Sequence, residues 1–157
     1  MIRHLLTMSL VLAAVACHQE AVLAPNAASR LGLSVAVSAP SVMAGQPDTI
    51  TITLANSAPD AVTLHFGSGC QILPYIADAH GTLVLPGGGG WMCTAALSQR
   101  TLAPHQTQTL RFVWTGSTTF ASEMPLLPLP SGLYYVFATL EANEARLTTT
   151  RVPVQLQ

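Results

Sequence analysis

Apolar and polar residues alternate along much of the chain, and the clearest example is the run from Thr49 to Leu54. Isoleucine or leucine occupies every second position of this run, with threonines between them. Successive side chains of a β strand point to opposite faces, so this pattern predicts a half-buried strand. The same two-residue period marks residues 31–38, 62–66, 110–114, 134–140 and 152–156.

Shorter segments at 70–76, 82–85 and 98–102 add expected strands, for eight or nine in total. The 11 glycines and 11 prolines favour tight turns between strands, and no helical period after the N-terminal apolar run exceeds a turn or two. These features predict an all-β fold, an immunoglobulin-like antiparallel β-sandwich of about 7–9 strands. Pro153 cannot donate to a strand ladder, which places the last strand at a sheet edge.

Residues 1–16 have the pattern of a secretory signal peptide. A basic start at Arg3 precedes an almost wholly apolar run over residues 5–15. This run is too short for a transmembrane helix, which needs about 20 apolar residues. A small-x-small cleavage site ends at Ala16, and Cys17 follows it as in a bacterial lipobox. We therefore expect a signal peptide over 1–16 and a lipid on Cys17.

The N-terminal features predict both the location and the domain organisation. A lipid on Cys17 anchors the chain to a membrane, and His18, which replaces the aspartate of inner-membrane lipoproteins in enteric bacteria, favours the outer membrane, facing the periplasm or the cell surface. Residues 17–30 are expected to form a lipidated cysteine and a flexible, disordered tether, and residues 31–157 the β-sandwich domain. The alternative is a secreted, unanchored protein with a free thiol.

An exported chain with three cysteines leaves one of them without a disulfide partner. If Cys17 carries lipid, Cys70 and Cys93 remain as a pair, and an oxidising compartment favours a disulfide between them. Closing such a loop stabilises a fold by about 3 kcal/mol in the chain-entropy model. The alternative is two buried thiols. No metal is expected, because neither His65 nor His80 completes a compact zinc spacing with these cysteines.

Composition and motifs argue against several classes of function. Only 8% of the residues are charged, the formal net charge is −1, and all 6 basic residues are arginines, so no basic surface for nucleic acid is expected. Ser68 lies in Gly-Ser-Gly, not in the Gly-x-Ser-x-Gly of a nucleophile elbow. The glycines at 87–90 lack the Lys-Ser/Thr that completes a phosphate loop. We expect neither an enzyme nor a cofactor.

Two segments are candidates for contact with a protein partner. The four-glycine run precedes Trp91 and Met92 and can present both at a hairpin tip; the alternative is a flexible tip with a core tryptophan. The apolar, proline-rich residues 124–130 contain Leu126 and Leu127 and suit docking in an extended conformation. The alternative for this second segment is packing across an open sheet edge.

The chain also carries a series of short, turn-rich motifs. These are a strand ending in Ser-Gly, an aromatic strand, an Asp-x-x-Gly turn, an Ala-Ala-Leu segment, a Leu-x-Pro turn and a Gly-x-Tyr-x-Val strand, at residues 62–69, 75, 78–81, 95–97, 102–104 and 132–136. In this order they resemble the Bacillus intracellular proteinase inhibitor domain family. The resemblance implies a protease as partner. The glycine run before Trp91, in place of a Trp-x-Trp-like stretch, and His105, in place of a turn glycine, depart from the family's pattern.

Our leading hypothesis is a lipid-anchored envelope protein whose β-sandwich binds another protein and acts as a proteinase inhibitor. The alternative is a structural or assembly lipoprotein of the cell envelope without inhibitory activity. Both hypotheses place the partner contacts on the domain and the membrane contact on the lipid.

Overall fold

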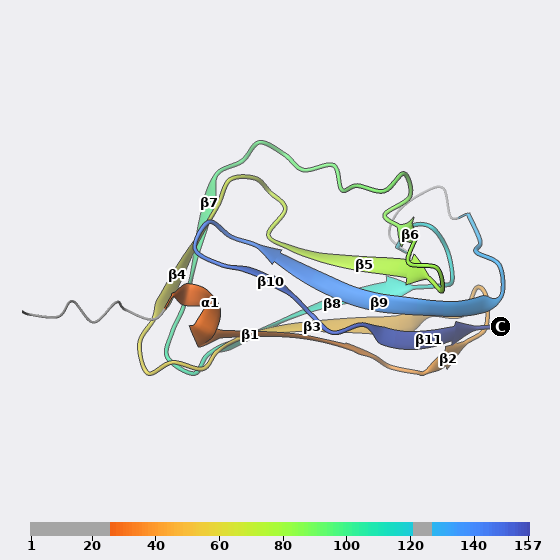
Figure 1. The fold of residues 1–157 in the computed structure, drawn as a ribbon, viewed down its shortest axis with the longest axis horizontal. Helices are drawn as coiled ribbons and strands as arrows, with labels where there is room; N and C mark the ends of the chain where they lie inside the picture. The colour runs from red at the N-terminus through yellow and green to blue at the C-terminus, as the bar shows by residue number, and fades with distance from the viewer. Residues whose placement is uncertain (1–25, 121–126) are drawn as a thin grey trace, which may run out of the picture.

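The computed structural model describes residues 26–120 and 127–157, which form an elongated, almost wholly β structure (Figure 1). Its elements are α1 (Ala27–Arg30), β1 (Leu31–Val37), β2 (Ser41–Val42), β3 (Asp48–Asn56), β4 (Val62–Phe66), β5 (Ile72–Asp78), β6 (Leu83–Leu85), β7 (Ser98–Leu102), β8 (Thr107–Trp114), β9 (Gly132–Glu141), β10 (Arg146–Thr148) and β11 (Val152–Leu156). Helix α1 lies at one end of the long axis and the C-terminus at the other.

The strands form two facing sheets and a smaller third one. The first sheet has the order β1-β3-β8, and the second has the order β2-β11-β9-β5-β6, with β10 paired to β9. Strands β4 and β7 form a two-stranded sheet near the α1 end. This confirms the predicted immunoglobulin-like β-sandwich. One pairing departs from the antiparallel prediction, because β2 runs parallel to β11.

The predicted strand number of about 7–9 was wrong, since the described residues contain 11 strands. The two that the sequence did not indicate are β2, with 2 residues, and β10, with 3. Strands this short do not complete an alternating pattern. Each exists because a longer neighbour, β11 or β9, offers a ladder for it to join.

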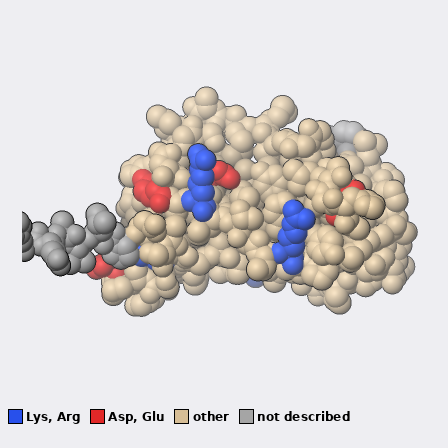
Figure 2. Space-filling view, viewed as in Figure 1, with Lys and Arg blue, Asp and Glu red and all other residues tan. Residues whose placement is uncertain are grey.

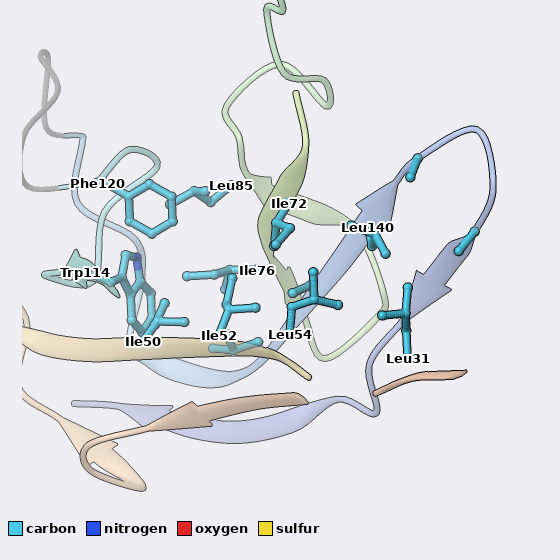
Figure 3. Packing of buried hydrophobic residues seen from close by; sticks show 14 of the residues in the cluster. Leu31, Ile50, Ile52, Leu54, Ile72, Ile76, Leu85, Trp114, Phe120 and Leu140 are labelled. Carbon is cyan, nitrogen blue, oxygen red and sulfur yellow. The ribbon is translucent and has the colours of Figure 1, made fainter. Parts of the chain in front are cut away.

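The core lies between the sheets and consists of the apolar faces that the alternation predicted. In β3 every second residue is buried, and Ile50, Ile52 and Leu54 are fully inaccessible. Figure 3 shows them grouped with Ile76 of the opposite sheet and, at one end, with Trp114. Burying one such aliphatic side chain stabilises a fold by roughly 1.5–3 kcal/mol.

A buried amide holds the corner where the first sheet continues into the third. Asn56 ends β3, and its side-chain nitrogen donates to the carbonyl oxygens of Asp60 at 2.8 Å and Ala103 at 3.0 Å. Asp60 lies between β3 and β4, and Ala103 lies between β7 and β8. The Asn56 side chain therefore holds both connections together. It also provides a hydrogen-bond donor for two carbonyls that no strand ladder pairs.

A buried carboxylate holds the point where the chain passes between sheets. Strand β1 belongs to the first sheet and β2 to the second, so the backbone crosses over between them. Asp48 Oδ1 accepts hydrogen bonds from the backbone N–H of Ser38 at 3.0 Å and of Ala39 at 3.1 Å, and from the Ser38 hydroxyl. The predicted turn after residue 38 is thus a crossover fixed by β3.

Pro153 lies in the part of β11 that is a sheet edge, as predicted, although the rest of β11 is not an edge. Strand β11 stands between β9 and β2, yet β2 pairs only with Gln155 and Leu156. At Pro153 the side away from β9 therefore has no strand partner among the described residues. Its missing N–H is tolerated for that reason.

The segment expected to be a disordered tether ends in ordered structure. Residues 27–30 form α1, capped by the side chain of Asn26, which accepts a hydrogen bond from the backbone of Ser29 at 3.0 Å. The carbonyl of Arg30 accepts from the backbone N–H of Ser57, at 2.8 Å. Expected disorder was therefore wrong for these four residues. Within the described parts of the chain, no helix is long and apolar enough to cross a membrane.

An ion pair joins β4 to the turn between β9 and β10. The Glu144 carboxylate accepts the backbone N–H of His65 at 2.8 Å and lies 2.5 Å from the same residue's Nδ1. The Asn143 N–H returns a hydrogen bond to the His65 carbonyl at 2.9 Å. The His65 backbone N–H holds the pKa of Glu144 below its ordinary value of 4.5.

This arrangement predicts a pH-dependent contribution to stability. A lowered pKa in the folded state means that the Glu144 carboxylate stabilises the fold above about pH 4.5, and that this stabilisation is lost as pH falls through the lower, folded-state pKa. Glu144→Gln should therefore be less stable than the parent at pH 7, with a difference that disappears in more acidic solution. Urea unfolding across this pH range measures it. The control Glu141→Gln, which loses only an exposed pair with Arg146 at 3.9 Å, should show a smaller loss; equal losses would contradict the role of Glu144.

Candidate functional site

Residues 91–97, here called the exposed segment, are the second part of the connection from β6 to β7 and form no helix, strand or turn. Figure 1 shows this connection running along the top of the molecule, outside both sheets. The Met92 side chain is 100% exposed and that of Leu97 is 84% exposed. Two large apolar side chains this exposed on one segment make the segment a candidate for contact with a partner.

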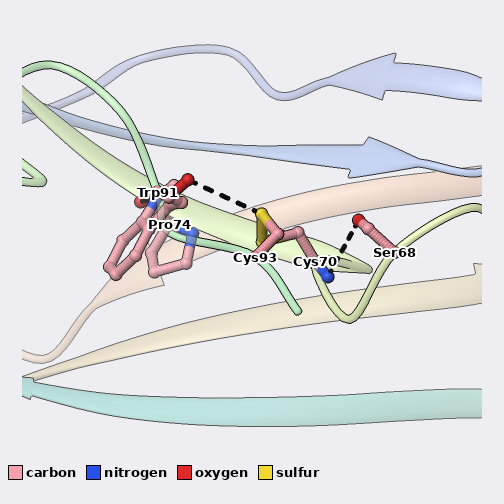
Figure 4. The surroundings of a disulfide bond; sticks show 5 residues. All are labelled: Ser68, Cys70, Pro74, Trp91 and Cys93. Carbon is pink, nitrogen blue, oxygen red and sulfur yellow. Dashed lines mark hydrogen bonds between the residues drawn. A yellow bond between two sulfur atoms is a disulfide. The ribbon is translucent and has the colours of Figure 1, made fainter. Parts of the chain in front are cut away.

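A disulfide anchors the exposed segment to the start of β5. Cys70 and Cys93 are bonded, with their Cα atoms 5.3 Å apart, which confirms the predicted pair. Figure 4 shows the bond beside Ser68, whose hydroxyl accepts the backbone N–H of Cys70 at 3.2 Å. The Cys93 Sγ also lies 3.7 Å from the Trp91 carbonyl oxygen, as a contact, since a disulfide sulfur carries no proton.

A glycine lets the neighbouring backbone approach the exposed segment. The Gly69 N–H donates to the Thr94 carbonyl at 2.9 Å. A Cβ on Gly69 would lie 2.4 Å from the Thr94 Oγ1, so a larger residue requires Thr94 to move. The disulfide and this hydrogen bond fix two consecutive residues of the segment.

Trp91 provides the third anchor and is half-buried. Its indole N–H donates to the Pro74 carbonyl at 3.1 Å. Pro74 has no backbone N–H to donate, and its carbonyl is already bonded to Trp91. At this position, therefore, the edge of β5 has no free backbone group with which another chain could pair. On its other side the Trp91 ring stacks on Phe120, with centroids 5.9 Å apart and planes 7° apart. The expected alternative of a core tryptophan is thus partly right, while Met92 beside it points into solvent.

An aromatic row continues from Trp91 in both directions. Phe120 reaches Phe112 of β8 at 5.0 Å, which ties the segment to the first sheet. Tyr75 contacts Trp91 edge-on at 6.4 Å and stacks on Phe137 at 5.2 Å, on the outer face of the second sheet. Through these rings Trp91 links the margins of the two sheets. Aromatic pairs in these geometries contribute about 0.5–1.5 kcal/mol each beyond burial.

A groove of about 410 Å³ lies beside Trp91 and Met92. Its lining residues are Leu85, Pro86, Gly87, Gly90, Trp91, Met92, Thr118 and Thr119. Gly88 and Gly89, at the tip, both have φ of +83° and open space around them. The glycine run therefore forms an exposed turn beside Trp91 and Met92.

The second predicted segment reaches the same end of the molecule. Leu126 lies outside the described residues, whereas Leu127 is described and 57% exposed. The Leu127 carbonyl accepts from the N–H of Thr118 at 2.9 Å, and the Thr118 carbonyl accepts from Gly87 at 3.2 Å. Leu127 and the groove that Met92 lines are thus connected through one residue. Cys17 also lies outside the described residues.

The surroundings of the site are poor in charge. Figure 2 shows charged residues at only a few places on one face of the molecule. Among the described residues no group of three histidine, cysteine or acidic side chains is placed to hold a metal. The exposed segment itself contains no charged residue. Contacts with a partner at this site therefore rest on apolar side chains and backbone groups. Leu97 was not among the predicted residues, because its exposure depends on the path of the segment.

Removing the disulfide should loosen the segment and lower stability. The double variant Cys70→Ala and Cys93→Ala should lose about 3 kcal/mol of unfolding free energy, because the cross-link closes a 23-residue separation. The milder Trp91→Phe, which keeps a ring but loses the hydrogen bond to Pro74, should lose about 1 kcal/mol. Urea unfolding measures both. A double variant as stable as the parent would show that the bond contributes nothing to the fold.

No curated protein matches this chain. The CARDB domain of a Pyrococcus furiosus protein, in complex with di-metal ions, is 17% identical with a TM-score of 0.46, over 87% of this chain and 97% of that one. A Listeria innocua β-glucosidase in complex with gluconolactone is 14% identical with a TM-score of 0.43, over 80% of this chain.

The chain spans only 16% of that β-glucosidase. The alkylpurine DNA glycosylase AlkC of Pseudomonas fluorescens, bound to DNA with an abasic site analog, is 15% identical with a TM-score of 0.47, over 82% of this chain and 30% of that one. Likeness this low carries no argument about function. The family model BsuPI, described as intracellular proteinase inhibitor, matches residues 35–145, which is more than half of the chain. The chain therefore belongs to the BsuPI intracellular proteinase inhibitor family.

Proposed function

We propose that this protein is a proteinase inhibitor, exported and held at the cell envelope by a lipid on Cys17. The single observation that carries the inhibitory role is the family match over residues 35–145. It covers the whole exposed segment and most strands of the two sheets, while β10 and β11 lie beyond it. In this proposal the protein acts by binding a protease, and it performs no catalysis of its own.

The disulfide supports the exported location. A Cys70–Cys93 bond persists in an oxidising compartment and is rare in the cytosol, where thiols are kept reduced. The signal-peptide pattern over residues 1–16 agrees with it. In this proposal the chain differs in location from family members that act inside cells, and its disulfide forms after export.

The length of chain between lipid and domain sets the reach of the inhibitor. Residues 18–26 separate Cys17 from α1, and nine residues span at most about 30 Å when fully extended. The long axis of the domain starts at α1, and β6, whose Leu85 lines the groove beside Met92, lies toward the opposite end. In this proposal, a protease that binds at the groove therefore lies away from the membrane surface.

The anchor is tested by the intact mass of protein isolated from its native membrane. We expect cleavage before Cys17, added acyl chains and a gain of two hydrogens on reduction of one disulfide. Cys17→Ser should carry no lipid, and the chain whose signal peptide has been removed should leave the membrane fraction. An unacylated native chain with three free thiols would contradict both the anchor and the location.

The inhibitory role is tested by titrating serine, cysteine, metallo- and aspartic proteases with the full chain purified in detergent. We expect stoichiometric inhibition of at least one of them by the oxidised protein. A protein heated until irreversibly unfolded serves as the control for competition by any substrate. If no protease is inhibited while a complex of envelope proteins co-purifies with the chain, a structural or assembly role replaces the inhibitory one.

A further inference from the structure

We propose that the Met92–Cys93 peptide bond is presented to a protease as a substrate, and that the Met92 side chain enters the apolar S1 pocket of a serine protease. The inference rests on the proposed inhibitory function and names the residue and the protease class through which it acts. It follows from the exposure of Met92, from the free backbone around it and from the anchors on both sides.

Met92 has the accessibility that a protease requires. Its side chain is 100% exposed, and Cys93 to Ala96 are exposed as well. Within the described chain, the Met92 backbone makes no hydrogen bond. The backbone hydrogen bond of the exposed segment is the one that the Thr94 carbonyl accepts from Gly69. Extended peptides bind other proteins through such unpaired backbone groups, while side-chain pockets add specificity.

The anchors hold the exposed segment before any protease arrives. Trp91 is fixed by its indole hydrogen bond to Pro74 and by stacking on Phe120, and Cys93 is fixed by the disulfide. A preorganised segment loses little conformational entropy on binding, so more of the contact energy appears as affinity. A flexible substrate with the same sequence lacks this advantage.

The same anchors act after the bond is attacked. The protease serine oxygen adds to the Met92 carbonyl carbon, the C–N bond to Cys93 breaks, and the Cys93 nitrogen leaves with a proton from the protease histidine. The new N-terminal Cys93 stays tied to Cys70, and the acylated Met92 is one residue away from the fixed Trp91. The amine therefore remains next to the acyl-enzyme and re-forms the peptide bond in competition with water.

Cleavage elsewhere in the exposed segment lacks this property. Leu97 is also exposed, but a cut after it leaves residues 95–97 without an anchor beyond Thr94. Its acyl-enzyme end can move away from the new N-terminus, which favours hydrolysis over re-formation. Leu97 is therefore the matched control for Met92: similar in size, exposed on the same segment and differently anchored.

The side chain at position 92 sets the class of protease. Methionine is unbranched and apolar, so it suits the hydrophobic S1 slot of chymotrypsin and not the S1 pocket of trypsin, which carries an aspartate. Exchange for arginine should reverse this preference. Because the side chain is fully exposed, the exchange should leave the fold unchanged.

The experiment compares the parent, Met92→Arg and Leu97→Arg as full chains purified in detergent, each titrated against chymotrypsin and trypsin. We expect the parent to inhibit chymotrypsin, and Met92→Arg to lose roughly 100-fold or more of this inhibition, since an unpaired charge in an apolar pocket is strongly disfavoured. The same variant should gain inhibition of trypsin. Leu97→Arg should retain the inhibition of the parent. Urea unfolding of each variant checks that its fold is intact.

A second readout locates the bond. After long incubation with a trace of chymotrypsin, reduced samples of the parent should contain one fragment ending at Met92 and one beginning at Cys93. In unreduced samples the disulfide should keep the two fragments joined, as a single species one water heavier than the intact chain. If the parent inhibits chymotrypsin but Met92→Arg inhibits it equally, the inference fails and the inhibitory function stands. Inhibition only of another protease class has the same meaning. If the parent inhibits no protease at all, the proposed function fails as well.

Discussion

The Cys70–Cys93 cross-link joins the start of β5 to a stretch of chain that has no secondary structure of its own. That stretch must travel from β6 to β7 along the outside of the sandwich, and no ladder holds it on the way. The disulfide fixes one point of this path, and the indole of Trp91 fixes a neighbouring one. Everything that the exposed segment can do with a partner depends on these two points, because they decide which side chains face solvent.

The same two anchors serve the stability of the fold. A sandwich is open where the margins of its sheets part, and here Trp91 links Tyr75 of the second sheet, through Phe120, to Phe112 of the first. Its hydrogen bond to Pro74 also removes a free carbonyl from the edge of β5. Trp91 therefore both stabilises the fold and holds the exposed segment in place, whereas Met92, the next residue, is fully exposed.

The sequence predicted the features that come from local periodicity. The inward set Ile50, Ile52 and Leu54 was correct because strand alternation needs no knowledge of the partner strand. The disulfide was correct because parity and compartment leave one pairing. Strands β2 and β10 were missed, since their few residues become strands only beside β11 and β9. The order of α1 was missed for the same reason: its last residue binds Ser57, which is distant in sequence. Trp91 and Met92 were both candidates, yet their opposite roles depend on the indole's contact with Pro74, which no pattern in the sequence indicates.

The central claim is that anchoring, and not the amino acids of the exposed segment alone, makes this chain an inhibitor. It is tested most directly by measuring protease inhibition over time by the oxidised protein and by protein that has been reduced and alkylated at its cysteines. The account predicts that the oxidised protein inhibits lastingly, while the reduced protein is cut within residues 91–97 and its inhibition fades as it is consumed. Equal and lasting inhibition by both forms would contradict it, because the protease would then be held by a surface that does not need the cross-link.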